Sequence, residues 1–119
     1  MRDFLKITKA LSDKTRVRIF KMLQSKAMCV CEVQTILGMA QSTVSKHLQI
    51  LEDAGLITST KEGLWVNYKV AENSHNIYAV SVARYLSGIL DDDPQVIADR
   101  EKAHTTNRVE ICRKKDHSS

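Results

Sequence analysis

The chain has 119 residues, of which 43% are hydrophobic and 27% are charged, with a formal net charge of +4 at pH 7. This length suits one compact domain with a modest core and excludes a second domain of ordinary size. The slight basic excess is compatible with a polyanionic partner without identifying one. No apolar run reaches the roughly 18 residues that span a bilayer, and the start lacks a signal-peptide pattern. We therefore expect a cytoplasmic protein with no membrane partner, whose three cysteines are reduced thiols.

Helices are predicted first. Apolar residues recur at helical spacing from Phe4 to Leu11 and again from Val17 to Leu23, and Ser12 or Asp13 can end one helix and cap the next. A third helix is predicted from Cys31 to Leu37, because Gly38 suits the left-handed position that follows a helix.

The fourth predicted helix begins at Gln41 or Ser42 and ends before Gly55. Its inward face is predicted from the helical spacing of apolar residues, and its outward face carries short polar and basic side chains. The residues expected to face inward are Val44, Leu48, Leu51 and Ile50.

A β-hairpin is predicted next, because residues 56–60 and 64–70 are rich in β-branched and aromatic residues and flank a turn at Lys61-Glu62-Gly63. An amphipathic helix is predicted from Ile77 to Leu90, and Pro94 is predicted in the first turn of another. We place the domain at residues 1–98 and a polar tail at 99–119, with partial disorder expected in the tail.

Helix, turn, helix and hairpin in this order predict a winged helix-turn-helix, mainly α with a β-hairpin wing. The second helix of such a motif enters the major groove of DNA. Its outward side chains can hydrogen-bond phosphates and base edges, although His47 could instead serve packing. The predicted DNA contacts are Gln41, Ser42, Thr43, Ser45, Lys46 and His47, with Lys61 in the turn of the hairpin.

Two cysteines stand at the start of the third helix, as Cys29-Val30-Cys31. Thiolates are the ligands that soft metals and metalloids prefer, whereas the alternative reading is a pair of small buried side chains. Residues two apart on an α-helix lie roughly 200° apart around its axis. We therefore expect that one ion bound by both sulfurs would unwind this turn and displace the third helix, which supports the reading helix.

The segment from Ala10 to Val70 resembles the ArsR/SmtB family of metal-sensing bacterial repressors. The resemblance lies in "ALSDKTRVRIFKML", "CVCEVQTILGMAQSTVSKHLQILEDAGLI" and "KEGLWVNYKV". It implies a homodimer on an inverted-repeat operator, with the first helix and residues 77–90 packing across the two-fold axis. Cys29 and Cys31 look like the arsenite or antimonite site of the arsenic-responsive members, but the position of their third cysteine is occupied here by Gln34.

The third ligand is therefore open. Cys112 is a candidate, from the same chain or the partner subunit, and a small ligand completing a two-sulfur site is the alternative. Cadmium and lead sensors of this family add cysteines from an N-terminal extension, and none precedes Phe4 here. Zinc sensors use Asp and His on the dimer helix, but residues 77–90 contain no histidine and His75 stands alone before them.

The predicted function is a DNA-binding repressor that releases its operator when As(III) or Sb(III) binds the metal ligands Cys29, Cys31 and Cys112. A cadmium- or lead-responsive repressor and a thiol-redox repressor of the same fold are the alternatives. A thiol enzyme is not expected, because the sequence contains no Cys-x-x-Cys motif, catalytic triad or phosphate loop.

Overall fold

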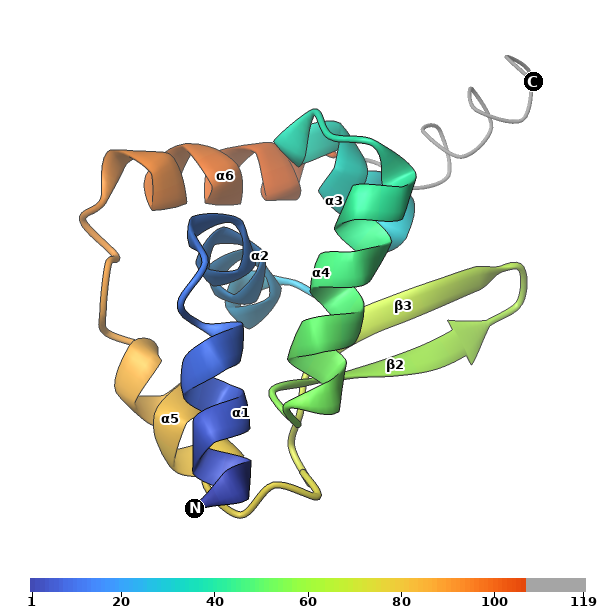
Figure 1. The fold of residues 1–119 in the computed structure, drawn as a ribbon. Helices are drawn as coiled ribbons and strands as arrows, with labels where there is room; N and C mark the ends of the chain where they lie inside the picture. The colour runs from blue at the N-terminus through green and yellow to red at the C-terminus, as the bar shows by residue number, and fades with distance from the viewer. Residues whose placement is uncertain (107–119) are drawn as a thin grey trace.

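The computed structural model describes residues 1–106, and these form six helices and a small sheet that lies at one side of the helical body (Figure 1). The mainly α winged helix-turn-helix predicted from the sequence is confirmed. In chain order the elements are α1 (Arg2–Ala10), α2 (Lys14–Ser25), β1 (Met28–Cys29), α3 (Val30–Leu37), α4 (Gln41–Asp53), β2 (Ile57–Glu62), β3 (Trp65–Val70), α5 (Ala79–Leu86) and α6 (Pro94–Thr105).

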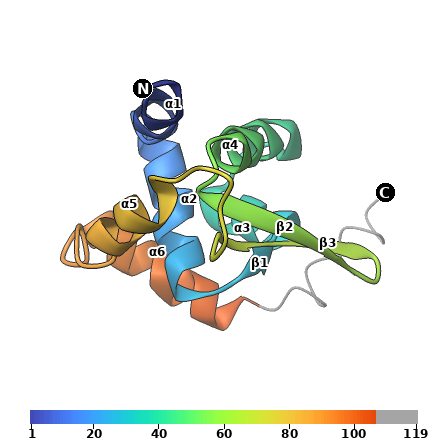
Figure 2. The ribbon, with the colours of Figure 1, turned by 90° about the horizontal axis from the view of Figure 1, so that it is seen from below.

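Helix α2 lies at the centre of the fold, where it contacts α4, α6 and β3 (Figure 2). Its Ile19, Phe20 and Met22 are completely buried and form the middle of the hydrophobic core. In the described part of the chain, every helix is too short or too polar to cross a membrane.

The predicted helix ends are largely confirmed. The Asp13 carboxylate caps α2 by accepting the backbone N–H of Arg16 at 3.1 Å. Asp93 caps α6 in the same way, with Pro94 in the first helical position. Gly38 ends α3 with φ of 66°, in the left-handed region that a glycine adopts without strain.

Helix α4 has the predicted bounds, and Val44, Leu48 and Leu51 are completely buried. The prediction that Ile50 faces inward is wrong, because 41% of its surface is exposed. One residue turns the helix by about 100°, so Ile50 lies to the side of the stripe that Leu48 and Leu51 define.

The sheet has three strands in the order β1-β3-β2, all antiparallel. The predicted turn is displaced, because β2 runs through Lys61 to Glu62, which pairs with Trp65. The loop is therefore Gly63-Leu64, and Gly63 supplies the positive φ, 61°, that two-residue hairpin loops need. Strand β1 was not predicted, and its Cys29 pairs with Asn67 of β3.

The C-terminal part differs from the prediction in two ways. Helix α5 ends at Leu86, four residues before the predicted Leu90, which itself has φ of 67°. Helix α6 crosses the predicted domain boundary at residue 98. Asp99 of α6 is 1% exposed and pairs with Arg18 of α2 at 2.9 Å, so the folded domain includes α6. The remainder of the predicted tail, with Cys112, lies outside the described residues.

Candidate DNA interface and thiol pair

The N-terminal half of α4 presents polar side chains to solvent. The residues predicted to contact DNA on this half are all exposed, namely Gln41, Ser42, Thr43, Ser45 and Lys46. The buried face of α4 packs against α2 and α3, so the opposite face is held outward on a rigid support. The positive end of the helix dipole lies on this half, which favours contact with an anionic backbone.

His47 is the predicted DNA-contacting residue that the fold ties down. Its side chain is 18% exposed, and its Nδ1 lies 3.3 Å from Nη1 of Arg16 on α2. Because arginine can only donate, Nδ1 accepts this hydrogen bond. The position of His47 is therefore compatible with both a packing role and a DNA contact. Its Nδ1 anchors α4, and its Nε2 is the nitrogen that could donate to a phosphate.

Arg16 lies inside the quoted motif, but its contacts with α1 and α4 were not predicted from the sequence. Its guanidinium also donates from Nε to the carbonyl of Ala10 at 2.7 Å and from Nη2 to that of Lys9 at 3.2 Å. One side chain thus joins the end of α1, the start of α2 and the reading helix α4. The local sequence carried no signal of the partner on α4, which is distant in the chain.

Lys61 lies on β2 near the tip of the hairpin, where it is exposed and pairs in register with Val66. The hairpin of β2 and β3 projects from the helical body, with Leu64 97% exposed at its tip (Figure 1). Lys46 on α4 and Lys61 on the hairpin are thus exposed on two separate elements, as expected of a winged helix-turn-helix that contacts DNA through both.

Cys29 connects the hairpin to α3, the helix that packs against α4. It pairs with Asn67 of β3 and is also the N-cap residue of α3, with an extended backbone. Its backbone N–H donates to Oε1 of Glu32 at 3.1 Å in a reciprocal capping arrangement. The side chain is 1% exposed, and burial raises the pKa of its thiol.

The two thiols are not both helical, because α3 begins at Val30 and only Cys31 lies within it. Cys31 is half-buried, whereas Cys29 is buried. The helix therefore need not unwind to bring two helical thiols together. Instead, ligation would require the Cys29 side chain to leave its buried position as the cap of α3.

Two thiols are the soft donors that the described residues bring together here. In that part of the chain, no group of three Cys, His, Asp or Glu side chains has the arrangement of a metal site. The pair suits a thiophilic ion by the chemistry of its donors, but it is an incomplete set for the three sulfurs that trivalent arsenic favours. A third donor has to come from elsewhere in the chain, from a partner subunit or from a small ligand.

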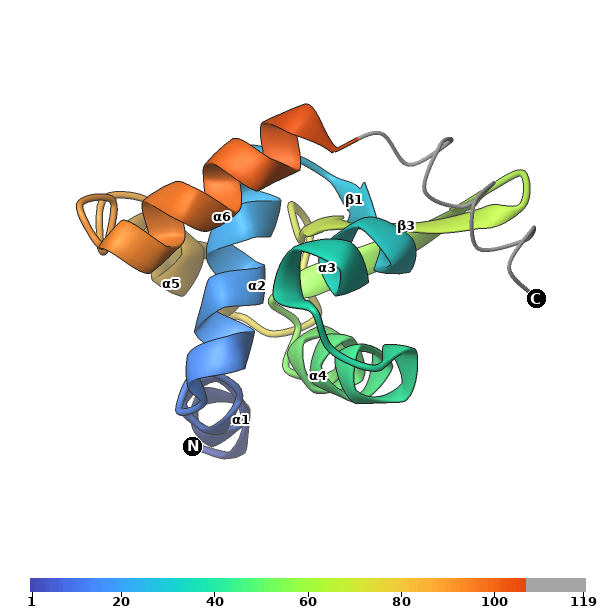
Figure 3. The ribbon, with the colours of Figure 1, turned by 90° about the horizontal axis from the view of Figure 1, so that it is seen from above.

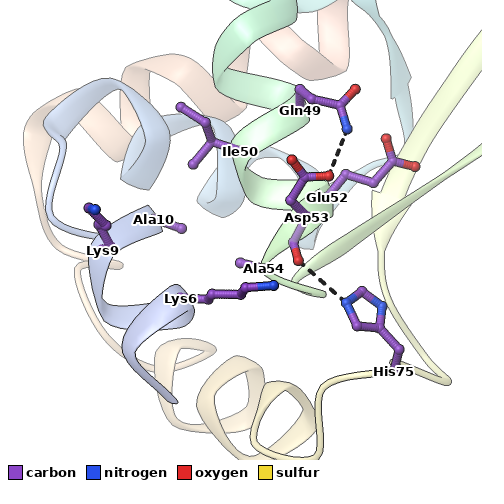
Figure 4. A pocket seen from close by; sticks show the side chains of 9 residues that line it. All are labelled: Lys6, Lys9, Ala10, Gln49, Ile50, Glu52, Asp53, Ala54 and His75. Carbon is purple, nitrogen blue, oxygen red and sulfur yellow. Dashed lines mark hydrogen bonds between the residues drawn. The ribbon is translucent and has the colours of Figure 1, made fainter. Parts of the chain in front are cut away.

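An open depression of about 690 Å³ lies between α1 and the C-terminal end of α4 (Figure 4). His75 points into this region and its Nε2 lies 3.3 Å from the carbonyl oxygen of Asp53, whose carboxylate accepts from Gln49 at 2.8 Å. These polar groups satisfy one another at the end of α4. His75 thus has a structural partner at the end of α4.

The arrangement of α3, α4 and the hairpin is that of a winged helix-turn-helix DNA-binding protein. Residues 13–59 match the family model described as bacterial regulatory protein, arsR family. The chain is 36% identical over 77 residues to the arsenical resistance operon repressor of Bacillus subtilis, covering 64% of this chain and 73% of that protein. The chain therefore belongs to the ArsR family, whose members are DNA-binding transcription regulators and not enzymes.

Two further proteins are similar to this chain. The chain is 41% identical over 69 residues to a Staphylococcus aureus homologue of the cadmium resistance regulatory protein CadC, covering 57% of each chain. The solution structure of a homodimeric winged helix-turn-helix domain from Mycobacterium bovis, a possible ArsR-family regulator, matches with a TM-score of 0.64 and 24% identity. That match covers 78% of this chain and 82% of the other, and it supports the fold alone.

Proposed function

We propose that this ArsR-family repressor binds an operator through α4 and the hairpin and releases it when As(III) or Sb(III) is bound by Cys29 and Cys31. The observation that carries the proposal is the position of Cys29, which is at once the partner of Asn67 in the wing and the cap of α3. A change at this one residue would therefore reach the wing directly and α4 through α3.

The proposed release follows from the local contacts. Cys29 would have to give up its buried position, and with it the capping contact between its side chain and the backbone N–H of Glu32. Helix α3 would lose its cap and the short β1–β3 pairing would weaken. Because α3 packs against α4, the orientation of the reading helix relative to the wing would change.

The third donor is proposed to be Cys112, with a small ligand as the alternative. Three sulfurs would match the pyramidal preference of trivalent arsenic. Cadmium is the second candidate inducer, favoured by the similarity to the cadmium regulator homologue of Staphylococcus aureus. Both candidates share the thiol pair and differ in the donors that complete it.

The proposed DNA partner is an inverted repeat, read by a homodimer in the cytoplasm. Two-fold symmetry of the protein would place one α4 in each of two successive major grooves. The proposed contacts are those of the exposed half of α4, with Nε2 of His47 and with Lys61 of the wing.

The inducer is identified by fluorescence anisotropy of a labelled palindromic operator fragment, with arsenite, antimonite, cadmium, zinc and peroxide titrated separately. The proposal predicts release at the lowest concentrations for arsenite or antimonite. Release by cadmium alone would select the second candidate. Release by peroxide alone would show that the thiols respond to oxidation and would contradict a ligand-induced release.

A further inference from the structure

Glu32 is a buried carboxylate that belongs neither to the proposed DNA contacts nor to the thiol pair. Its side chain is 2% exposed, and it lies in the first turn of α3. Its Oε1 accepts the backbone N–H of Cys29 at 3.1 Å, while the side chain of Cys29 contacts the backbone N–H of Glu32. The two residues therefore hold one another in a reciprocal cap, in which the Cys29 side chain is buried.

Lys26 binds the other oxygen of this carboxylate. Its Nζ lies 3.4 Å from Oε2 of Glu32, 3.1 Å from the carbonyl oxygen of Ala103 and 3.3 Å from that of Thr106. An ammonium group has three donors, so these three acceptors match its capacity. The two carbonyls lie at the C-terminal end of α6, which contacts α3 (Figure 3), and the helix dipole favours a cation there.

The end of α6 that binds Lys26 belongs to a helix that is itself held in place. Asp99 of α6 is 1% exposed and accepts two hydrogen bonds from Arg18 of α2, at 2.9 and 3.0 Å. This bidentate ion pair fixes α6 against α2. A carboxylate as buried as that of Glu32 is costly without its charged partner. Loss of Lys26 should therefore drive Glu32 toward solvent and open the cap of Cys29.

We propose that Lys26 and Glu32 are positioning residues that keep the Cys29 thiol buried, so that this link sets how often the thiol becomes available to a ligand. The inference rests on the proposed function, in which Cys29 leaves its cap to bind the inducer. The inducer then has to overcome the link between Lys26 and Glu32 as well as the burial of the thiol. A weaker link should lower the arsenite concentration that releases the operator.

The test is the rate at which iodoacetamide alkylates Cys29 in the folded, full-length chain. A Cys31→Ser background leaves Cys29 as the one thiol of its tryptic peptide, and mass spectrometry of that peptide gives the rate. Lys26→Met should raise the rate about tenfold, because a charge-assisted link is lost. Loss of a cation by itself disfavours the reactive thiolate, so a faster reaction reports exposure of the thiol and not its ionisation.

Lys26→Arg should restore the slow rate, and Lys102→Met, which removes an exposed lysine on α6, should leave it unchanged. The rates are measured at several low urea concentrations, because a local opening exposes little surface and depends weakly on urea, unlike global unfolding. An unchanged rate in Lys26→Met, or a rise that follows urea as steeply as global unfolding does, would overturn the proposal. Because neither arsenite nor operator is present, these outcomes are decided separately from the proposed function.

Discussion

At the scale of single residues, the reading surface depends on short side chains on α4 with one lysine among them. Ser42, Thr43 and Ser45 keep the surface low, so that the helix could approach the floor of the major groove. Lys46 is the long basic side chain on this exposed half and suits a phosphate. Position and specificity would then come from different residues of the same helix.

Lys46→Ala should weaken operator binding by a similar factor for all sequences and reduce the slope of log affinity against log salt by about one. Anisotropy titrations at several salt concentrations measure both quantities. Lys102→Ala, on the exposed surface of α6, is the matched control. An unchanged salt slope in Lys46→Ala would exclude a phosphate contact by this side chain.

Asp91 gives the fold a dependence on pH. Its carboxylate lies 3.1 Å from Nζ of Lys21, which is 1% exposed, and 2.9 Å from Nη1 of Arg100. The hydrogen bond from Lys21, helped by that from Arg100, lowers the pKa of Asp91 below its ordinary 3.8. A lowered folded-state pKa stabilises the fold above pH 3.8, and this contribution is lost as the pH falls through the folded value.

Asp91→Asn should therefore lower the melting temperature at neutral pH and make it less sensitive to acid, because the buried ammonium of Lys21 would lose its counter-charge. Thermal unfolding followed by circular dichroism between neutral and acidic pH gives both effects. Asp92→Asn, at the exposed neighbouring residue, is the control. If the melting temperatures of the wild type and of Asp91→Asn fell by the same amount as the pH was lowered, Asp91 would not be the source of the pH dependence.

At the scale of elements, the connection from α4 to the wing depends on Gly55. It has φ of 83°, and an added Cβ would lie 2.5 Å from Oγ of Ser74 and 2.8 Å from Cβ of Asn76. Gly55→Ala should therefore cost about 2 kcal/mol or more in the free energy of unfolding. Gly88→Ala, where an added Cβ meets nothing within 4 Å, should be close to neutral. Denaturant unfolding measures the free energy of unfolding of both variants. Equal values for Gly55→Ala and Gly88→Ala would contradict the strain expected at Gly55.

The elements that could be predicted from the sequence are those whose signal is local. The bounds of α4 follow from its apolar spacing and the glycine beyond it, and the capping of α6 follows from Asp93 and Pro94. Strand β1 is two residues long and exists because it pairs with β3, far along the chain. The length of α6 was missed because an Arg18–Asp99 ion pair buries part of it, and apolar periodicity does not detect such a pair.

In the candidate site, too, local features were predicted from the sequence and tertiary contacts were not. The exposed residues of α4 were found from the helical period, whereas the tether from Arg16 to His47 depends on tertiary contact. The cysteines were recognised as soft ligands by residue type. The cap position of Cys29 was not predicted, because it depends on where α3 begins.

At the scale of the whole molecule, α1 and α5 carry an apolar surface that suits a second copy of the chain. The rings of Phe4 on α1 and of Tyr78, the N-cap residue of α5, pack edge to face with their centroids 5.9 Å apart. Around them, Leu5 is 52% exposed, Ile77 76% and Tyr85 71%. Exposed apolar residues grouped in this way are typical of an interface, and the proposed homodimer would cover them.

Ile77→Glu should shift the protein from dimer to monomer and weaken operator binding, because a charge would be placed within the proposed interface. Size-exclusion chromatography with light scattering measures the first effect. Leu64→Glu, at the still more exposed wing tip, should leave the oligomeric state unchanged. A dimer that persists in Ile77→Glu would place the interface on another surface.

Ligand binding by the thiols of Cys29 and Cys31 is proposed to lower the affinity for the operator, and one arsenite titration tests this most directly. Operator anisotropy is compared for the wild type and for Cys29→Ser/Cys31→Ser, in which serine keeps the cap of α3. The account predicts equal operator affinity without arsenite and release of the wild type alone when arsenite is added. Release of the double variant at the same arsenite concentration would contradict it.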